Sequence, residues 1–258
     1  MKKLISIDLR ADLGFLKKPD INEGIYLTYN MLHKPVLLGI LGAVIGLEGY
    51  RQKGQLPEYY LALKDMRIGI QPLYAQKGYF LKSVIQYCNG VGYAGESDGK
   101  PGGTLIIREQ ILIRPAFRCY LELDLSNALH QKILDSLKQC EAEYLPYFGK
   151  NEFSLWWENF KVHEYAPFQF DRDFVIMTLF MKAEQVMREM VRLPTISFLA
   201  SGGEGNFMCF EELPIGFDER LLQYEKRQFV FTNFTFGRQS RIEGLYQLRG
   251  QDGLVQLF

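Results

Sequence analysis

The chain has 258 residues, of which 47% are hydrophobic, 23% charged and 14% aromatic. These proportions are typical of a globular protein with a buried core, and they exclude a disordered, collagenous or coiled-coil chain. Residues 1–118 hold 16 basic and 10 acidic side chains, a net charge of +6, while residues 119–258 hold 14 and 20, a net charge of −6. A basic half is typical of a surface that binds phosphates.

The chain begins with a predicted strand. Residues 3–10 place Ile5, Ile7 and Leu9 on one side and polar residues on the other, which is the period of two expected for a strand with one buried face. A polar loop and a second extended stretch, Tyr26 to Tyr29, follow.

A helix is expected from Pro35 to about Glu48, because proline is favoured in the first turn of a helix. Small residues recur along it with the spacing i, i+3, i+4, i+7; they are Gly39, Gly42, Ala43 and Gly46. Glycine costs about 1 kcal/mol in a helix interior relative to alanine. The stripe therefore predicts a face that packs very closely against another element.

The next predicted elements are mostly strands. They are expected at Met66–Tyr74, Gly78–Cys88, Thr104–Arg114 and Ala116–Leu123. A loop with six glycines, Asn89 to Gly103, separates the middle two. A helix from an N-cap at Ser126 to about Glu143 and an extended stretch, Phe160 to Tyr165, come after them.

The order of these elements predicts an α+β fold with a ferredoxin-like, βαββαβ domain, the plan of RNA-recognition motifs, over residues 1–166. A smaller, mainly β domain is expected over residues 167–258, with a short helix at Met181–Val191 and strands around Ile196–Leu199, Phe207–Glu211, Gln228–Phe236 and Leu245–Arg249.

Motifs for common chemistries are missing or stand in the wrong context. Gly90, Gly92 and Gly95 fit the dinucleotide pattern GxGxxG, but the residues after them, ESDGKPGG, are incompatible with the helix that this site needs. The three histidines form no metal-binding pattern, and the four cysteines form no CxxC pair. We therefore expect no metal, no cofactor and no disulfide framework.

The chain shows no targeting signal at its start, and its longest apolar run, Val36 to Leu47, is too short to span a bilayer. These features favour a cytoplasmic protein without a membrane segment. Basic and aromatic residues are interleaved in the first half, as suits a single-stranded nucleic acid. Arg108 and Arg114 are expected on the same side of one strand, about 20 Å apart at roughly 3.3 Å per residue. A solvated sheet edge guarded by basic residues is the alternative interpretation.

Four segments resemble one family. They are ISIDLRADLGFLKKPD, IYLTYNMLHKPVLLGILGAVIGLE, ILIRPAFRCYLEL and PYFGKNEF. In this order they are similar to the fifth family of CRISPR-associated proteins, the subunit that caps the 5′ end of the guide RNA in type I surveillance (Cascade) complexes, and most like type I-B. The likeness covers about the first 155 residues.

The resemblance implies a protruding glycine-rich hairpin, or thumb, at about residues 76–110. It also implies that the chain holds the 5′ handle of the guide RNA (crRNA) and contacts a neighbouring backbone subunit and the large subunit of the complex. Target DNA would be met only indirectly, through the complex. The RNA-binding residues that it implies are Arg10, Lys17, Lys18, Tyr29, Lys34, Arg108 and Arg114.

One subtype of this family is a metal-independent endoribonuclease that cuts the guide precursor with a tyrosine and an adjacent Lys-His pair. This chain has no Lys-His dipeptide, and its nearest equivalent, His33-Lys34, is reversed. We therefore expect a non-catalytic role, with the endoribonuclease as the alternative. An RNA-recognition-like module outside any CRISPR complex is a third interpretation.

Overall fold

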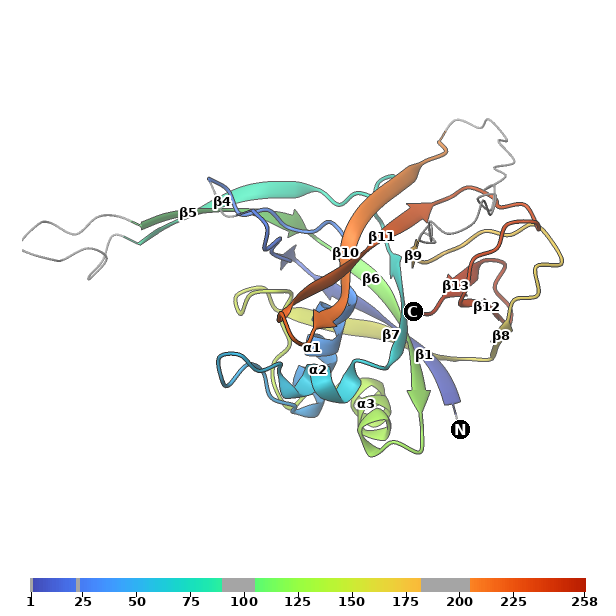
Figure 1. Cartoon of the computed structure of the whole chain (residues 1–258), viewed down its shortest axis with the longest axis horizontal. Coiled ribbons are helices and arrows are strands. Elements are labelled where there is room, and N and C mark those ends of the chain that lie inside the picture. Colours follow the sequence, from blue (N-terminus) through green and yellow to red (C-terminus); the bar gives the residue numbers. More distant parts are fainter. Residues whose placement is uncertain (1, 22–23, 90–104, 182–204) are drawn as a thin grey trace, which may run out of the picture.

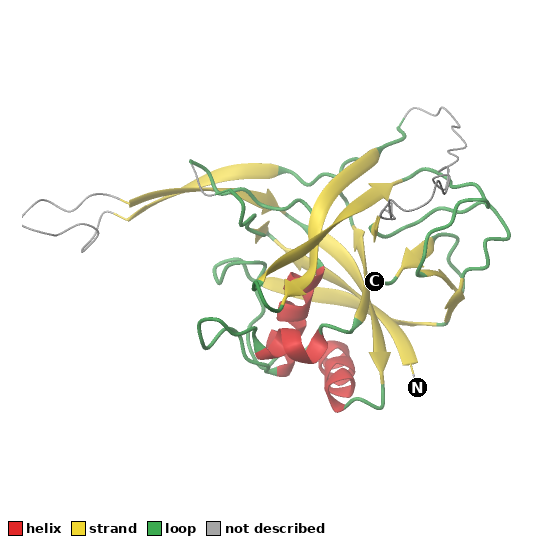
Figure 2. Cartoon of the chain, viewed as in Figure 1, coloured by secondary structure: helices red, strands yellow, loops and turns green. Residues whose placement is uncertain are grey.

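The computed structural model describes residues 2–21, 24–89, 105–181 and 205–258 and shows an α+β protein. Neighbouring strands in each of the described sheets run antiparallel, and the described helices gather on one side of the molecule (Figure 2). No helix within the described residues is both long and apolar enough to cross a membrane.

A four-stranded sheet forms the centre of the fold (Figure 1). Strand β1 pairs with β6 on one side and with β7 on the other, and β3 lies beside β6, so that the spatial order is β3-β6-β1-β7. The register between β1 and β7 shifts between Ser6 and Asp8. The strands of this sheet are β1 (Lys2–Ala11), β3 (Arg67–Pro72), β6 (Ala116–Asp124) and β7 (Leu155–His163).

One face of this sheet is covered by helices α1 (Lys34–Ile45) and α3 (Ala128–Gln139). The alternation in β1 puts Ile5, Ile7 and Leu9 on that face, and all three are fully buried in the main hydrophobic cluster together with apolar residues of both helices. The strand predicted at the start of the chain and its buried face are therefore confirmed.

The glycine stripe of α1 packs against a short helix, α2 (Glu58–Leu63). A Cβ atom on Gly42 would lie 2.4 Å from the Cβ of Tyr59, and one on Gly39 would lie 3.5 Å from the ring of Tyr59. Gly46, which has φ +79°, is the left-handed C-cap. The predicted close approach is confirmed, but α1 ends at Ile45, earlier than expected.

The second predicted helix is shorter than expected at both ends. Its N-cap is Asn127, whose side-chain oxygen accepts a hydrogen bond from the Leu129 amide at 2.9 Å. The predicted cap, Ser126, was wrong, because its hydroxyl donates to Asp124 at 2.8 Å and holds the turn before the helix. Cys140 ends the helix in the left-handed conformation.

A two-stranded hairpin of β4 (Lys82–Asn89) and β5 (Leu105–Ile113) extends away from the body of the protein (Figure 1). Its root is paired to β2 (Leu13–Gly14). Lys77 and Gly78 have positive φ and form a tight turn, so β4 begins later than predicted. Most of the predicted glycine-rich loop, residues 90–104, lies outside the described residues.

Strands from the second half of the chain form two further sheets. One consists of β9 (Phe180–Met181), β10 (Met208–Asp218) and β11 (Gln223–Thr232), and the other of β8 (Tyr165–Pro167), β12 (Leu245–Leu248) and β13 (Leu254–Gln256). Leu213 and Phe229 enter the same hydrophobic cluster as the first half.

Two expectations for the second half remain untested. The predicted helix at residues 181–191 and the strand at 196–199 lie outside the described residues, apart from Met181, which ends β9. The division of the chain at residue 166 stays a prediction.

Candidate nucleic-acid interface

The loop before α1 lies along the hairpin and pairs with its backbone. The Tyr26 amide donates to the carbonyl of Arg108 at 2.9 Å, and the Gln110 amide donates to the carbonyl of Tyr26 at 2.9 Å. The loop is itself folded back, because Lys17 and Thr28 form an antiparallel bridge. Residues more than 80 positions apart in the sequence are thereby fixed side by side.

Cations and an aromatic ring lie on this loop and on the hairpin strands beside it. We call the group the hairpin-base cluster; it consists of Lys17, Lys18, Tyr26, Lys82 and Arg108. The ammonium of Lys17 lies 3.8 Å from the ring centroid of Tyr26. Arg108 is exposed, and its Nε donates to Gln86 at 2.9 Å, which orients the guanidinium on the hairpin surface.

Lys82 was not among the sequence-predicted residues. Burial lowers its pKa, and the nearby positive charge of Lys18 lowers it further, whereas Glu211 and Cys209 act in the opposite direction. The two ammonium groups are therefore close enough to repel each other. The sequence held no signal for this pair, since 63 residues separate them and only the folded loop brings them together.

One carboxylate, that of Glu211 in β10, fixes the loop beneath the cluster. It accepts hydrogen bonds from the amides of Asn30 and Met31, both at 2.9 Å, and lies 3.4 Å from the ammonium of Lys18. The side chain of Asn30 in turn donates to the carbonyl of Gly78 at 2.8 Å and accepts from the Phe80 amide at 3.1 Å. Loop, hairpin root and β10 thus form one bonded junction.

A second brace comes from the segment Pro146–Glu152. Lys150 forms ion pairs with Glu109 of the hairpin at 2.7 Å and with Glu152 at 3.2 Å, and its ammonium lies 4.3 Å from the ring centroid of Tyr87. Gly149 has φ +89°, and a Cβ there would come within 1.8 Å of the carbonyl oxygen of Phe15. Only glycine fits this close approach, which explains why a glycine stands at position 149.

Of the seven predicted residues, Lys17 and Lys18 lie on the folded loop, and Arg108 lies on the hairpin strand whose backbone is bonded to that loop. Tyr29 lies beneath them, 2% exposed, with its ring 5.1 Å from Lys18 and edge-on to His33. Burial raises the pKa of Tyr29. Its ring is inside the core and does not present a face for stacking with a base.

Lys34, Arg10 and Arg114 lie apart from the cluster. Lys34 is partly buried at the start of α1, where its ammonium lies 3.5 Å from the Phe258 carbonyl oxygen and burial lowers its pKa. Arg10 is on the central sheet, with its guanidinium 5.0 Å from the ring of Tyr74.

The predicted alignment of Arg108 and Arg114 was wrong. Strand β5 ends at Ile113, and Arg114 has φ +49°, with its amide donating to the Asp12 carbonyl at 2.8 Å. This left-handed residue turns the chain toward β6, so the alternation of the strand does not extend to it.

The histidines make internal contacts. Burial lowers the pKa of His33 to about 3, and its ring packs between those of Tyr29 and Tyr224. His130 Nδ1 accepts from the Asp124 amide at 2.9 Å, and His163 Nε2 lies 2.8 Å from the hydroxyl of Ser6. In the part of the chain that the structure describes, no three His, Cys, Asp or Glu side chains converge on a metal position.

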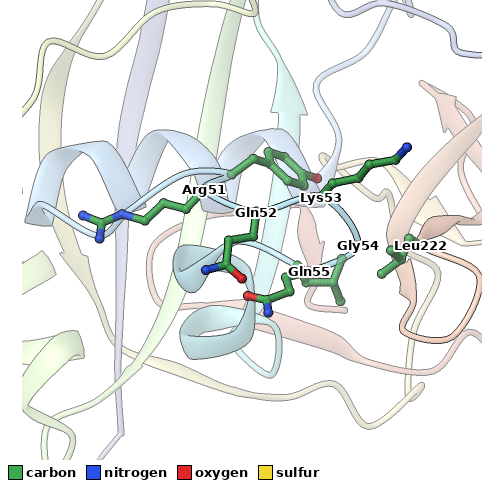
Figure 3. Close-up of a pocket in the computed structure, with 8 residues that line it drawn as sticks. Arg51, Gln52, Lys53, Gly54, Gln55 and Leu222 are labelled. Carbon is green, nitrogen blue, oxygen red and sulfur yellow. The ribbon is translucent and has the colours of Figure 1, made fainter.

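A surface depression of about 290 Å³ lies in the loop between α1 and α2. Arg51 and Lys53 point in opposite directions there, away from Gln52 and Gln55 (Figure 3). All four side chains are exposed, so the depression offers no buried polar group to a ligand.

No family model and no curated protein matches the chain. Three solved structures of CRISPR-associated proteins are similar in fold. A type III-B Cmr-beta complex bound to cognate target RNA and AMPPnP contains a chain with 8% identity and a TM-score of 0.53 over 98% of both chains. A CRISPR protein from Archaeoglobus fulgidus has 12% identity and a TM-score of 0.47 over 99% of this chain and 98% of that one. A CRISPR RNA-guided surveillance complex contains a chain with 14% identity and a TM-score of 0.46, over 89% of this chain and 90% of that one.

Proposed function

We propose that this chain is a non-catalytic subunit of a type I CRISPR surveillance complex and holds the 5′ handle of the guide RNA at the hairpin-base cluster. The observation that carries the proposal is the presence of four cations and the Tyr26 ring on a loop and a hairpin that are bonded to each other through their backbones. Lysine and arginine neutralise phosphates, while an aromatic ring stacks with an unpaired base.

The fold supports this proposal. When β2, α2 and the β4–β5 hairpin are set aside, the order β1, α1, β3, β6, α3, β7 agrees with the βαββαβ plan expected of a ferredoxin-like unit, which RNA-recognition motifs use. The fold is also similar to that of a chain in an RNA-bound type III-B complex. The assignment to the fifth family, and within it to type I-B, rests on the sequence resemblance.

The proposed partners follow from the same assignment. The hairpin is the thumb, and it contacts a neighbouring backbone subunit. The large subunit lies beside this chain, and target DNA is met through the assembled complex. The two-domain division at residue 166 and a cytoplasmic location complete the proposal.

A non-catalytic role is supported by the positions of the histidines. Metal-independent RNA cleavage needs a general base on the 2′-hydroxyl and an acid on the leaving oxygen. His33 is 2% exposed and neutral at physiological pH, and it lies against Tyr29 and Tyr224 instead of facing solvent. We therefore expect repeat RNA incubated with the purified chain in EDTA to remain intact while it is bound. Cleavage at one phosphodiester that persists in EDTA would favour the endoribonuclease.

The hairpin-base cluster is tested by the salt dependence of RNA affinity. Each phosphate contact on a single strand adds about 0.7 to the slope of log affinity against log salt. Removing two contacts in the double variant Lys17→Ala/Arg108→Ala should therefore weaken binding of repeat RNA and reduce the slope by about 1.4. Both side chains are exposed, so the fold is expected to be retained.

The matched control is Lys53→Ala/Lys138→Ala, which removes two exposed lysines outside the cluster, one in the loop between α1 and α2 and one at the end of α3. It should leave affinity and slope unchanged. If both double variants lower the slope equally, the chain binds RNA by its overall charge and the cluster is not the site.

A further inference from the structure

The face of the central sheet opposite the helices is divided into a covered end and an open end. At the covered end, Leu4 and Tyr120 are buried beneath Leu248, Val255 and Leu257 from the second half of the chain. The other end carries Arg10, and among the described residues no strand of the second half covers it.

At the open end, one row of residues runs across three strands and the segment that follows β3. Arg10 of β1 lies opposite Trp156 of β7 and opposite Ala116 of β6. The amide of Leu73 donates to the Ala116 carbonyl at 2.8 Å, which brings Tyr74 to the far end of the row. Side chains directly opposite each other in antiparallel strands share a face, so the arginine lies between two aromatic residues with a small residue beside it.

The two aromatic side chains face solvent. Tyr74 is 80% exposed and Trp156 is 44% exposed. The neighbouring Trp157 points to the helical face, where its indole N–H donates to the Leu137 carbonyl at 3.0 Å, so alternation along β7 sends Trp156 to the opposite face. Exposed rings of this size on a sheet surface have little structural reason of their own.

Arg10 is held in place by both neighbours. Its guanidinium lies 5.0 Å from the Tyr74 ring centroid, its Nη2 donates to the Tyr74 hydroxyl at 3.2 Å, and its Nε lies 2.7 Å from Glu158. In the next row, Arg118 is fixed by a bidentate pair with Asp8 at 2.6 and 2.9 Å and remains a quarter exposed. Two oriented guanidinium groups therefore border the aromatic residues.

We propose that Trp156, Tyr74, Arg10 and Arg118 form a platform on which one or two unpaired bases of a single-stranded RNA stack, with the intervening phosphates next to the arginines. Aromatic rings on a four-stranded antiparallel sheet stack bases in a way that tolerates many sequences. The site is separate from the hairpin-base cluster, shares no residue with it, and depends on the proposed function only in that both require RNA on this chain.

The surroundings of the platform favour RNA over DNA. Glu158 and Asn159 are partly or fully exposed beside Arg10, and the Glu158 side chain is 42% exposed. A 2′-hydroxyl can donate to the Glu158 carboxylate, whereas deoxyribose offers this carboxylate no donor. The carboxylates of Asp8 and Glu158 offset the charges of the two arginines, so stacking, not phosphate neutralisation, supplies most of the affinity.

The chain contains only two tryptophans, which gives the test a direct readout. Titration with a ten-nucleotide oligouridylate should quench the fluorescence of the exposed Trp156 in the full chain, and the quenching should be absent in Trp156→Phe, which retains Trp157. An abasic ribose-phosphate strand of the same length should cause no quenching. Deoxyuridine strands should quench only at several-fold higher concentrations.

Affinity measured by the anisotropy of labelled oligouridylate supplies the second readout. Trp156→Ala and Tyr74→Ala should each weaken binding roughly fivefold to a hundredfold, the range for loss of one stacked base, without changing the salt slope. Tyr144→Ala, which removes a 55% exposed tyrosine outside the sheet, is the control and should bind as the parent chain does.

The outcomes separate this inference from the proposed function. RNA binding that depends on Lys17 and Arg108 but leaves Trp156 fluorescence unchanged overturns the platform and retains the hairpin-base cluster. Quenching that persists in Lys17→Ala/Arg108→Ala with unchanged affinity supports the platform and overturns the cluster. Equal quenching by RNA and DNA overturns the commitment to RNA.

Discussion

The middle of β1 is buried on both faces, but by different kinds of contact. On the helical face, Ile7 and Leu9 are fully buried among apolar side chains. On the opposite face, Ser6 is fully buried and Asp8 is 1% exposed, and both are bonded: Ser6 to His163, and Asp8 to partners on β6 and β7. A buried face therefore need not be an apolar one, provided that every polar group has a partner.

This difference bears on function as well as stability. The apolar face holds α1 and α3 on the sheet and needs only matching shapes. On the opposite face, which we call the bonded face, hydrogen bonds and ion pairs fix the orientation of the side chains. Where the strands of the second half no longer cover this face, Arg10 and Arg118 are oriented by their ion pairs and reach solvent. Polar pairs beneath a surface can thus position the groups that a ligand meets.

The comparison predicts its largest effect for Asp8→Ala. This change leaves the Arg118 guanidinium in the sheet without its bidentate partner, and such a loss costs about 3–5 kcal/mol in a buried pair. Because Arg118 is 26% exposed and can turn toward water, we expect the low end, about 3 kcal/mol, in the free energy of unfolding measured with urea.

A double-mutant cycle with Arg118→Met provides the control. If Asp8 stabilises the fold through Arg118, the double variant should be more stable than Asp8→Ala alone, because the unpaired charge is gone. Strictly additive losses would contradict the bonded-face interpretation and make Asp8 an independent contributor.

A smaller effect is expected on the apolar face. Ile7→Val removes one methylene from a packed cluster and should lower the free energy of unfolding by about 1 kcal/mol. The loss should be the same at low and high salt, since no charge is involved. A loss that varies with salt would show that the apolar face is coupled to the ion pairs behind it.

The sequence predicted the helical face of this sheet well and the opposite face poorly, for a physical reason. Alternation at Ile5, Ile7 and Leu9 reports a buried face directly. The cover on the other face comes from residues such as Leu248 and Val255, more than 200 positions away, and alternation in β1 cannot report it. The glycine stripe of α1 correctly predicted a close neighbour, but α2, which supplies it, has six residues and is too short to show a helical period.

The candidate site was predictable only in part, because the sequence pattern reports local features and not which distant segments lie beside each other. Lys17, Lys18 and Arg108 stand out in the sequence as cations, and the structure pairs the loop that carries the two lysines with the strand that carries the arginine. Tyr29 was predicted to face RNA from its position in the loop, yet the loop folds inward and buries its ring. Lys82 and Trp156 gave no local signal, because their importance depends on which strand lies beside them.

The smallest effect that the comparison predicts is a pH dependence specific to the bonded face. Burial raises the pKa of Asp8, but the hydrogen bonds from Arg118 and Asn159 outweigh burial, so that the pKa in the folded chain lies below the ordinary value. The unfolded chain therefore binds the proton first as the pH falls. It follows that the stability contributed by the Asp8 charge is complete above the unfolded pKa of about 3.9 and is lost as the pH falls through the folded value.

Comparison of the parent chain with Asp8→Asn isolates the contribution of the Asp8 charge to the free energy of unfolding. The other carboxylates titrate in both proteins, so their contributions cancel. The difference in the free energy of unfolding should be constant from pH 7 to about pH 5 and should narrow below about pH 3.9, where the unfolded chain takes up the proton. The same comparison with Ile7→Val should show no narrowing, since an apolar contact carries no proton. A difference between the parent and Asp8→Asn that widens toward low pH would mean that Asp8 is protonated in the fold, and the bonded face would then rest on hydrogen bonds without an ion pair.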